Sequence, residues 1–170
     1  MIGIYDKDNE ESIRVSNEFK CTSFESFDSL LDSVDVIDIV APTPFHFNYA
    51  KQAINKNKHV FIEKPVCTTS KESEELIKLG DLKNVKIQVG HVERFNPAFT
   101  KVESEISKPM FIESHRLAKF NPRGTDVSVV LDLMIHDIDI ILKTVDSKVK
   151  DILSSGVSVS YTHLTLPTKA

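Results

Sequence analysis

Apolar and polar positions alternate along the first ninety residues as short strand-like runs and longer helix-like segments. The strand-like runs are MIGIY (1–5), CTSF (21–24), DVIDIVAP (35–42), HVFIEKP (59–65) and VKIQVGH (85–91). Between them, apolar residues recur at helical spacing in EESIRVSNEF (10–19), FDSLLDS (27–33), FHFNYAKQAINKN (45–57) and KESEELIKLGD (71–81). Strands that follow helices in this order, and that are apolar on both faces, predict an α/β fold: a parallel sheet covered by helices on both sides.

Two of these helices have recognisable starts. Asn9 is a suitable N-cap for the first helix. Either Thr69 or Ser70 can cap the helix over 71–81, where Glu72 suits the first turn.

The pattern changes after residue 96, where we place a domain boundary. A helix over 97–107 leads to an alternating strand over 109–120, a loop over 121–126 and a long apolar helix over 127–145. Residues 148–160 fit a strand or a hairpin arm. We therefore expect one domain over 1–96 and part of an α+β domain with an antiparallel sheet over 97–159. Residues 160–170 do not continue the pattern, and we exclude them as a non-native tail.

Composition narrows the class of protein. Among 170 residues, 41% are hydrophobic and 27% are charged, and the net charge is −4, which is ordinary for a soluble globular protein. No basic tract indicates nucleic-acid binding, and no apolar run has the length of a membrane span. The N-terminus lacks the features of a signal peptide, and Cys21 and Cys67 fit reduced thiols. We expect a cytoplasmic protein.

Polar residues repeatedly follow the predicted strands. Ligands bind at the carboxyl ends of the strands in an open α/β sheet, so these residues predict a shared crevice. They are Asp6, Pro42, Thr43, His46, Glu63, Lys64, Pro65, Gly90 and His91.

Asp6 has two interpretations. An acid after the second strand of a dinucleotide-binding sheet accepts hydrogen bonds from the adenosine ribose, which favours NAD over NADP. Alternatively, Asp6 begins a turn with Asp8 and Asn9.

Five motifs occur in order along the chain: YDKD, APTPFHFNYA, EKP, VGHVERFNP and DLMIHDIDIIL. In this order the chain resembles the Gfo/Idh/MocA oxidoreductase family, and within it the MviM-like and UDP-N-acetylglucosamine dehydrogenase-like branch. The resemblance implies a Rossmann domain that binds NAD or NADP, and a C-terminal domain whose open antiparallel sheet shapes the substrate site. It further implies hydride transfer from a hydroxyl of a sugar or sugar nucleotide, in a homo-oligomeric parent protein.

Motif matching then implies roles for individual residues. Lys64 of EKP would lie near the substrate hydroxyl and the nicotinamide, and a cis peptide bond would join it to Pro65. Asp132 and His136 match the family's D-x-x-x-H pair and are expected to be catalytic with Lys64. The expected cofactor-binding residues are Asp6, Pro42, Thr43, His46, Glu63, Lys64 and Pro65. The expected substrate-binding residues are His91, Arg94, Asn96 and Arg116.

The residues themselves support part of this assignment. Asp132 and His136 are four apart and share a helix face, and a neutral imidazole suits the removal of the alcohol proton. Lys64 could instead be a solvated loop residue, and Asp132 and His136 a satisfied polar pair inside an apolar helix. Another alternative is that His91, Glu93 and Arg94 form a structural ion network. We expect no metal site in the run HDID, because Asp137 and Asp139 do not share a helix face.

The Gly-rich turn of a dinucleotide-binding fold, G-x-G-x-x-G, does not occur, and the five glycines are isolated. The pattern starts at what would be the second strand of a Rossmann sheet, so we expect a gap at the sheet's centre with unpaired edges on both sides. We expect this chain to fold poorly and bind NAD weakly, and the enzymatic function to belong to its parent. An alternative function is a non-catalytic dinucleotide-sensing regulator on the same fold.

Overall fold

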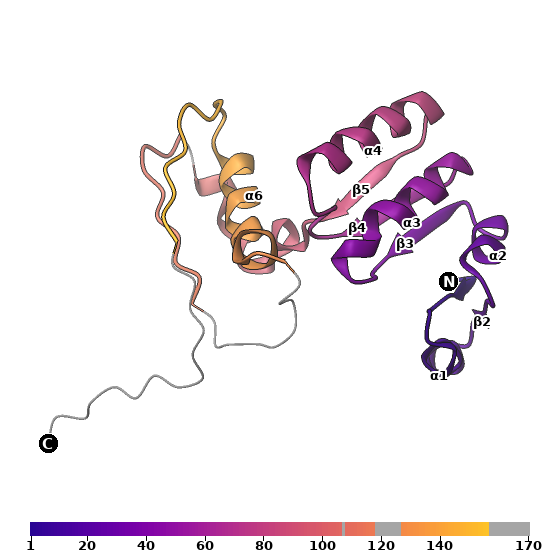
Figure 1. Cartoon of the computed structure of the whole chain (residues 1–170). Helices are drawn as coiled ribbons and strands as arrows, with labels where there is room; N and C mark the ends of the chain where they lie inside the picture. The colour runs from indigo at the N-terminus through magenta and orange to yellow at the C-terminus, as the bar shows by residue number, and fades with distance from the viewer. Residues whose placement is uncertain (107, 118–126, 157–170) are drawn as a thin grey trace, which may run out of the picture.

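The computed structural model describes residues 1–106, 108–117 and 127–156, and Figure 1 shows their arrangement. The strands are β1 (Gly3–Ile4), β2 (Thr22–Ser23), β3 (Val36–Ile39), β4 (His59–Glu63) and β5 (Ile87–Gly90). The α-helices are α1 (Asn9–Phe19), α2 (Phe27–Asp32), α3 (Thr43–Asn55), α4 (Ser70–Lys83), α5 (Pro97–Val102) and α6 (Ile135–Thr144). Strands and helices alternate as expected through residue 90.

The strands form two parallel sheets. One has the order β1-β2, and the other has the order β3-β4-β5, with Ile37 opposite Val60 and Val60 opposite Ile87. A Rossmann sheet has the strand order 3-2-1-4-5-6, and the two sheets correspond to its strands 3-2 and 4-5-6. The expected gap between two unpaired edges, at β1 and β3, is confirmed among the described residues.

Burial corrects one expectation about the strands. Ile37 and Ile39 of β3 are buried, but Val36 is 58% exposed, so β3 is not covered on both faces. The helices that pack against β3 and β4 explain this, because α3 contacts both strands and also lies against α4. One covered face leaves every second side chain of β3 open. The core beneath that face comprises Leu30, Leu31, Ile37, Ile39, Ala50, Ala53, Ile54, Val60, Ile62 and Leu76.

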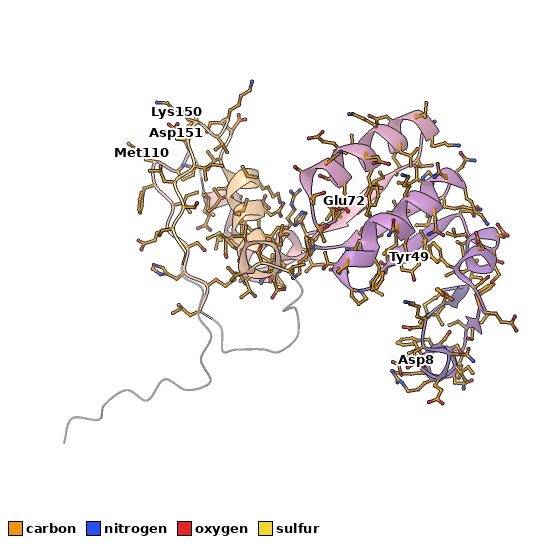
Figure 2. The ribbon with its side chains drawn as sticks, in the orientation of Figure 1. Asp8, Tyr49, Glu72, Met110, Lys150 and Asp151 are labelled. Atoms are coloured by element: carbon orange, nitrogen blue, oxygen red, sulfur yellow. The ribbon has the colours of Figure 1, made fainter. Side chains whose placement is uncertain are left out.

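The helix starts are fixed by side-chain caps. Asp8, rather than Asn9, is the N-cap of α1, because its carboxylate accepts the backbone N–H groups of Glu10 and Glu11. The structure selects Thr69 for α4: its hydroxyl accepts the N–H of Glu72, and the Glu72 carboxylate accepts the N–H of Thr69. Asp8 and Glu72 are labelled in Figure 2.

In the second half of the chain, the structure agrees with the sequence-based expectations only for the helices. A helix begins at Pro97 as expected, but it ends at Val102 and passes into a 3₁₀ turn over Glu103–Glu105. The long apolar helix is confirmed over Val130–Thr144, with a π-helical turn at Val130–Met134 before α6.

The expected antiparallel sheet does not appear in the described part of the chain. Residues 108–117 and 148–156 are extended in Figure 1 but have no strand ladder. The strand expectation is therefore wrong for these residues, since a strand requires a hydrogen-bonded partner. Figure 2 labels Met110, Lys150 and Asp151 in these segments, at the opposite end of the molecule from the parallel sheets. The expected loop over 121–126, which contains Arg123, and the tail over 160–170 lie outside the described residues. No helix in the described ranges is long and apolar enough to cross a membrane.

Candidate active site where strand ends meet helix α6

Lys64 lies at the end of β4, where the chain meets the helix that carries Asp132. The strand ends at Glu63, and the expected cis bond between Lys64 and Pro65 is confirmed. Lys64 Nζ donates to the backbone oxygen of Asp132 at 2.8 Å and to its carboxylate Oδ1 at 3.0 Å. The Lys64 side chain is only 21% exposed, so it is not a solvated loop lysine.

Asp132 receives both of these bonds from within the π-helical turn Val130–Met134. A π turn interrupts the regular i to i−4 ladder, and such turns often occur at functional sites. Here the backbone oxygen and the carboxylate of one residue point to the same ammonium. The turn therefore ties α6 to the end of β4 through a single residue.

His136 lies in α6, and its surroundings favour the neutral form of its ring. Burial lowers the pKa of His136, and the positive charges of Lys64 and Arg116 lower it further, while Glu93 acts in the opposite direction. Its Nδ1 atom is buried and has no hydrogen-bond partner among the described residues. The alternative of a satisfied polar pair is therefore not supported, because His136 has an unused ring nitrogen. A neutral imidazole with a free nitrogen can accept a proton.

The two other acids of the run HDID pair with arginines. Asp137 accepts bonds from Arg116 Nε at 2.7 Å and from the hydroxyl of Ser114 at 3.0 Å. Asp139 accepts bonds from Nε and Nη2 of Arg94. We expected Arg94 and Arg116 to bind substrate, but in the structure both guanidinium groups are occupied by carboxylates. Within the described ranges, no group of three or more His, Cys, Asp or Glu side chains is placed to hold a metal ion.

Asn96 and His91 complete this side of the site. The Asn96 side chain caps α5 by accepting the N–H of Ala98 at 3.0 Å, and it donates to Glu93. These bonds give Asn96 a structural role, and its expected contact with substrate stays a prediction. His91 Nδ1 lies 3.9 Å from the Asp139 carboxylate and has no hydrogen-bond partner in the described residues. The Arg94–Asp139 contacts fit the alternative that this segment forms a structural ion network.

Three of the expected cofactor residues lie at the start of α3. Pro42 is the N-cap of α3, with no side-chain bond, and Thr43 is the first residue of that helix. His46 is buried, at 1% exposure, and its two ring nitrogens contact the backbone oxygens of Pro65 and Ala41. These contacts hold the turn after β4 against the start of α3. The expected role of His46 in binding the cofactor stays a prediction.

Glu63 is the last residue of β4 and lies opposite Gly90 of β5 at the same edge of the sheet. Its carboxylate accepts the N–H of Lys64 at 3.2 Å. A Cβ atom added to Gly90 would lie 3.0 Å from Glu63 Oε1, so the glycine leaves room for this carboxylate. Burial, with a smaller contribution from the charge of Glu63, raises the pKa of Asp38.

Asp6 follows β1, and its carboxylate accepts the N–H of Asp8 at 2.8 Å. This bond is the turn that we gave as one interpretation of Asp6. The neighbouring Lys7 ammonium lies 5.2 Å from the centre of the Phe45 ring in α3. The end of β1 therefore lies beside the start of α3, at the edge where the polar residues after β3, β4 and β5 also gather.

Sequence reasoning missed Asp137 and Asp139 as partners. The sequence carried no local signal for these pairings, because Arg94 and Arg116 are 45 and 21 positions from the acids that they contact. Choosing among the acids required the fold.

A parallel α/β fold with polar residues gathered at its strand ends defines the class of Rossmann-type nucleotide-binding proteins. Residues 1–91 match the model of the Gfo/Idh/MocA family, described as an oxidoreductase family with an NAD-binding Rossmann fold. This match covers more than half of the chain, and the chain belongs to that family.

The relatives agree with this assignment. UDP-N-acetylglucosamine 3-dehydrogenase of Acidithiobacillus ferrooxidans is 35% identical over 159 residues, which are 93% of this chain and 51% of that protein. A solved structure of that enzyme, GnnA, superposes with a TM-score of 0.87 at 34% identity, covering 94% of this chain and 53% of the other. The dehydrogenase MviM from Clostridium difficile has a TM-score of 0.71 at 25% identity, covering 85% and 48%. The chain thus spans about half the length of these relatives.

Proposed function

We propose that this chain is part of an NAD-dependent dehydrogenase that oxidises a hydroxyl of a sugar nucleotide. The observation that supports the proposal is the contact of Lys64, at the end of β4, with Asp132, together with the effect of the Lys64 charge on the pKa of His136. The printed activity of the Acidithiobacillus ferrooxidans relative supports the substrate class. UDP-N-acetylglucosamine is therefore the first substrate to test.

The residues present fit a dinucleotide in part. The N-terminus of α3 offers few donors to an anionic ligand, because Pro44 has no backbone N–H and the N–H of Phe45 donates to the oxygen of Pro42 at 2.9 Å. Asp6 offers a carboxylate at the end of β1 for a ribose hydroxyl, which favours NAD over NADP. When bound, the nicotinamide ring would supply the hydride acceptor.

The protein's own residues would perform the proton chemistry. His136, kept neutral by burial and nearby cations, accepts the hydroxyl proton as the hydride leaves the carbon. The Lys64 ammonium donates a hydrogen bond to the same oxygen and favours its negative charge. Asp132 fixes the position of that ammonium.

The test measures turnover and binding separately. Because the chain spans half of its relatives, it is assayed alone and as a chimaera extended by the flanking segments of the Acidithiobacillus ferrooxidans enzyme. NAD reduction is followed with UDP-N-acetylglucosamine and with free sugars. Lys64→Ala and His136→Ala should each reduce the rate on the order of hundredfold, and Lys71→Ala, an exposed lysine on α4, should not.

Two outcomes would contradict the proposal. Full turnover in both site variants would show that these residues do not perform the reaction. Coenzyme binding without turnover on any sugar in the panel would favour the alternative of a dinucleotide-sensing regulator.

A further inference from the structure

Asp139 is the one buried carboxylate within the described ranges, with 7% of the residue exposed. Both of its oxygens face the guanidinium of Arg94, which donates through Nε at 2.7 Å and through Nη2. Arg94 belongs to the 3₁₀ turn Val92–Phe95 that directly follows β5. Charge-assisted hydrogen bonds with two prongs are stronger than single neutral ones, and here they hold the buried carboxylate although the Arg94 side chain is 42% exposed.

The position of Asp139 on its helix gives this pair a geometric role. His136 and Asp139 are three apart and lie on one face of α6, and Asp132 lies in the π-helical turn that precedes this helix. At one end of this segment, Asp132 holds Lys64 from the end of β4. At the other end, Asp139 holds Arg94 from the end of β5. His136 lies between two attachments to neighbouring strands.

We propose that Arg94 and Asp139 form a positioning pair that docks α6 against the end of β5 and thereby holds the imidazole of His136 in the site. Arg94 then acts through His136 instead of binding substrate. This inference rests on the proposed function for the role of His136, but the docking itself can be tested without catalysis.

The groups around His136 make the test specific. The charges of Lys64, Arg116 and His91 lower its pKa, and the charge of Glu93 raises it. His136 in turn contributes to the lowered pKa values of Asp137 and Asp139. The largest cause of the lowered pKa is burial, which depends on the helix remaining docked. If the pair positions the helix, loss of either partner exposes the ring, and the pKa of His136 rises toward the ordinary value of about 6.5.

A purely electrostatic role predicts a different result. Arg94→Gln would leave an unpaired carboxylate, which raises the pKa of His136. Asp139→Asn would leave an unpaired guanidinium, which lowers it. The two roles therefore predict opposite changes for Asp139→Asn.

The experiment follows the ring signals of His136 by NMR across pH in the intact chain. It compares the wild type with Arg94→Gln, Asp139→Asn and the double variant. We expect all three variants to raise the midpoint, because each of them breaks the contact that docks α6 and exposes the ring. Arg94→Lys, which keeps a cation but loses the fork, should give a smaller rise. Arg14→Gln breaks exposed contacts with Glu11 and Glu18 on α1 and is the matched control with no shift.

Methyl signals of Ile54 and Ile62 report whether the core stays folded. A lowered midpoint in Asp139→Asn, or an unchanged one in all variants, would overturn the proposal. If Arg94→Gln loses the core signals, Arg94→Lys decides alone, and an unchanged midpoint in that variant overturns the proposal. In the chimaera, loss of positioning should lower kcat on the order of tenfold or more with KM little changed. A raised KM with an unchanged midpoint would instead make Arg94 a substrate contact.

Discussion

At the scale of single residues, the site depends on one imidazole being kept neutral by two effects. Burial and the Lys64 ammonium both lower the pKa of His136, and the pair Lys64–Asp132 keeps the ammonium in place. Because the folded-state pKa lies below the unfolded value, His136 contributes fully to stability above about pH 6.5. This contribution is lost as the pH falls through the folded-state pKa.

Replacing Lys64 with Met should therefore raise the pKa of His136, because the substitution removes the positive charge that lowers this pKa, while burial of the ring persists. The midpoint should stay below the ordinary value, because burial is the larger cause. NMR titration of His136 in the intact chain measures it. Lys71→Met removes a lysine from the exposed surface of α4 and should leave the midpoint where it was. An equal midpoint in Lys64→Met and the wild type would mean that the ammonium does not act on this ring.

Sequence reasoning predicted the residues of this site whose contacts follow from motif order, namely Lys64, Asp132 and His136. It gave a structural ion network as one alternative for Arg94, but it did not predict the contacts that Arg116 and His46 make within the chain. Arg94 and Asp139 are 45 positions apart, and local pattern carries no information about which acid a distant arginine meets. Several polar residues that were expected to face a ligand therefore also hold the scaffold, and their contacts with a ligand stay predictions.

At the scale of elements, helix boundaries follow from capping chemistry. Thr69 and Ser70 are equally plausible caps in sequence, and the structure assigns the capping box to Thr69 with Glu72. The sequence did not predict the π turn before α6, because local pattern in Val130–Met134 does not distinguish it from an α-helical turn and its contact with Lys64 joins residues 68 positions apart.

The capping box gives a direct stability test. Thr69→Ala should lower the free energy of unfolding by about 1 kcal/mol, because the N–H of Glu72 loses its acceptor. Urea unfolding monitored by circular dichroism measures the change. Ser70→Ala is the matched control, since the Ser70 hydroxyl has no cap bond, and it should cost much less. A larger loss in Ser70→Ala than in Thr69→Ala would reverse the assignment of the cap.

At the scale of the whole molecule, the missing Gly-rich turn led to the prediction of a gap between two sheets, and the alternation of strands and helices predicted the parallel α/β fold. This alternation was not enough to predict that β3 is covered on one face, because apolar content alone does not tell how many helices reach a strand. The core lies beneath β3 and β4, whereas the β1–β2 sheet joins it through the partly buried side chains of Tyr5 and Phe24.

This uneven packing predicts uneven stability, which hydrogen exchange can measure on two matched amides. The N–H of Phe24 donates to Ile4 at 2.9 Å, and the N–H of Val60 donates to Lys86 at 3.0 Å, so the two bonds are alike. Val60 lies in the central strand of the three-stranded sheet and is 2% exposed, but Phe24 follows an edge strand of a two-stranded sheet. Because exchange reports the free energy of local opening, Phe24 should exchange at least about tenfold faster than Val60. Equal rates would show that both sheets open in one cooperative step, and the gap between them would then not divide the fold energetically.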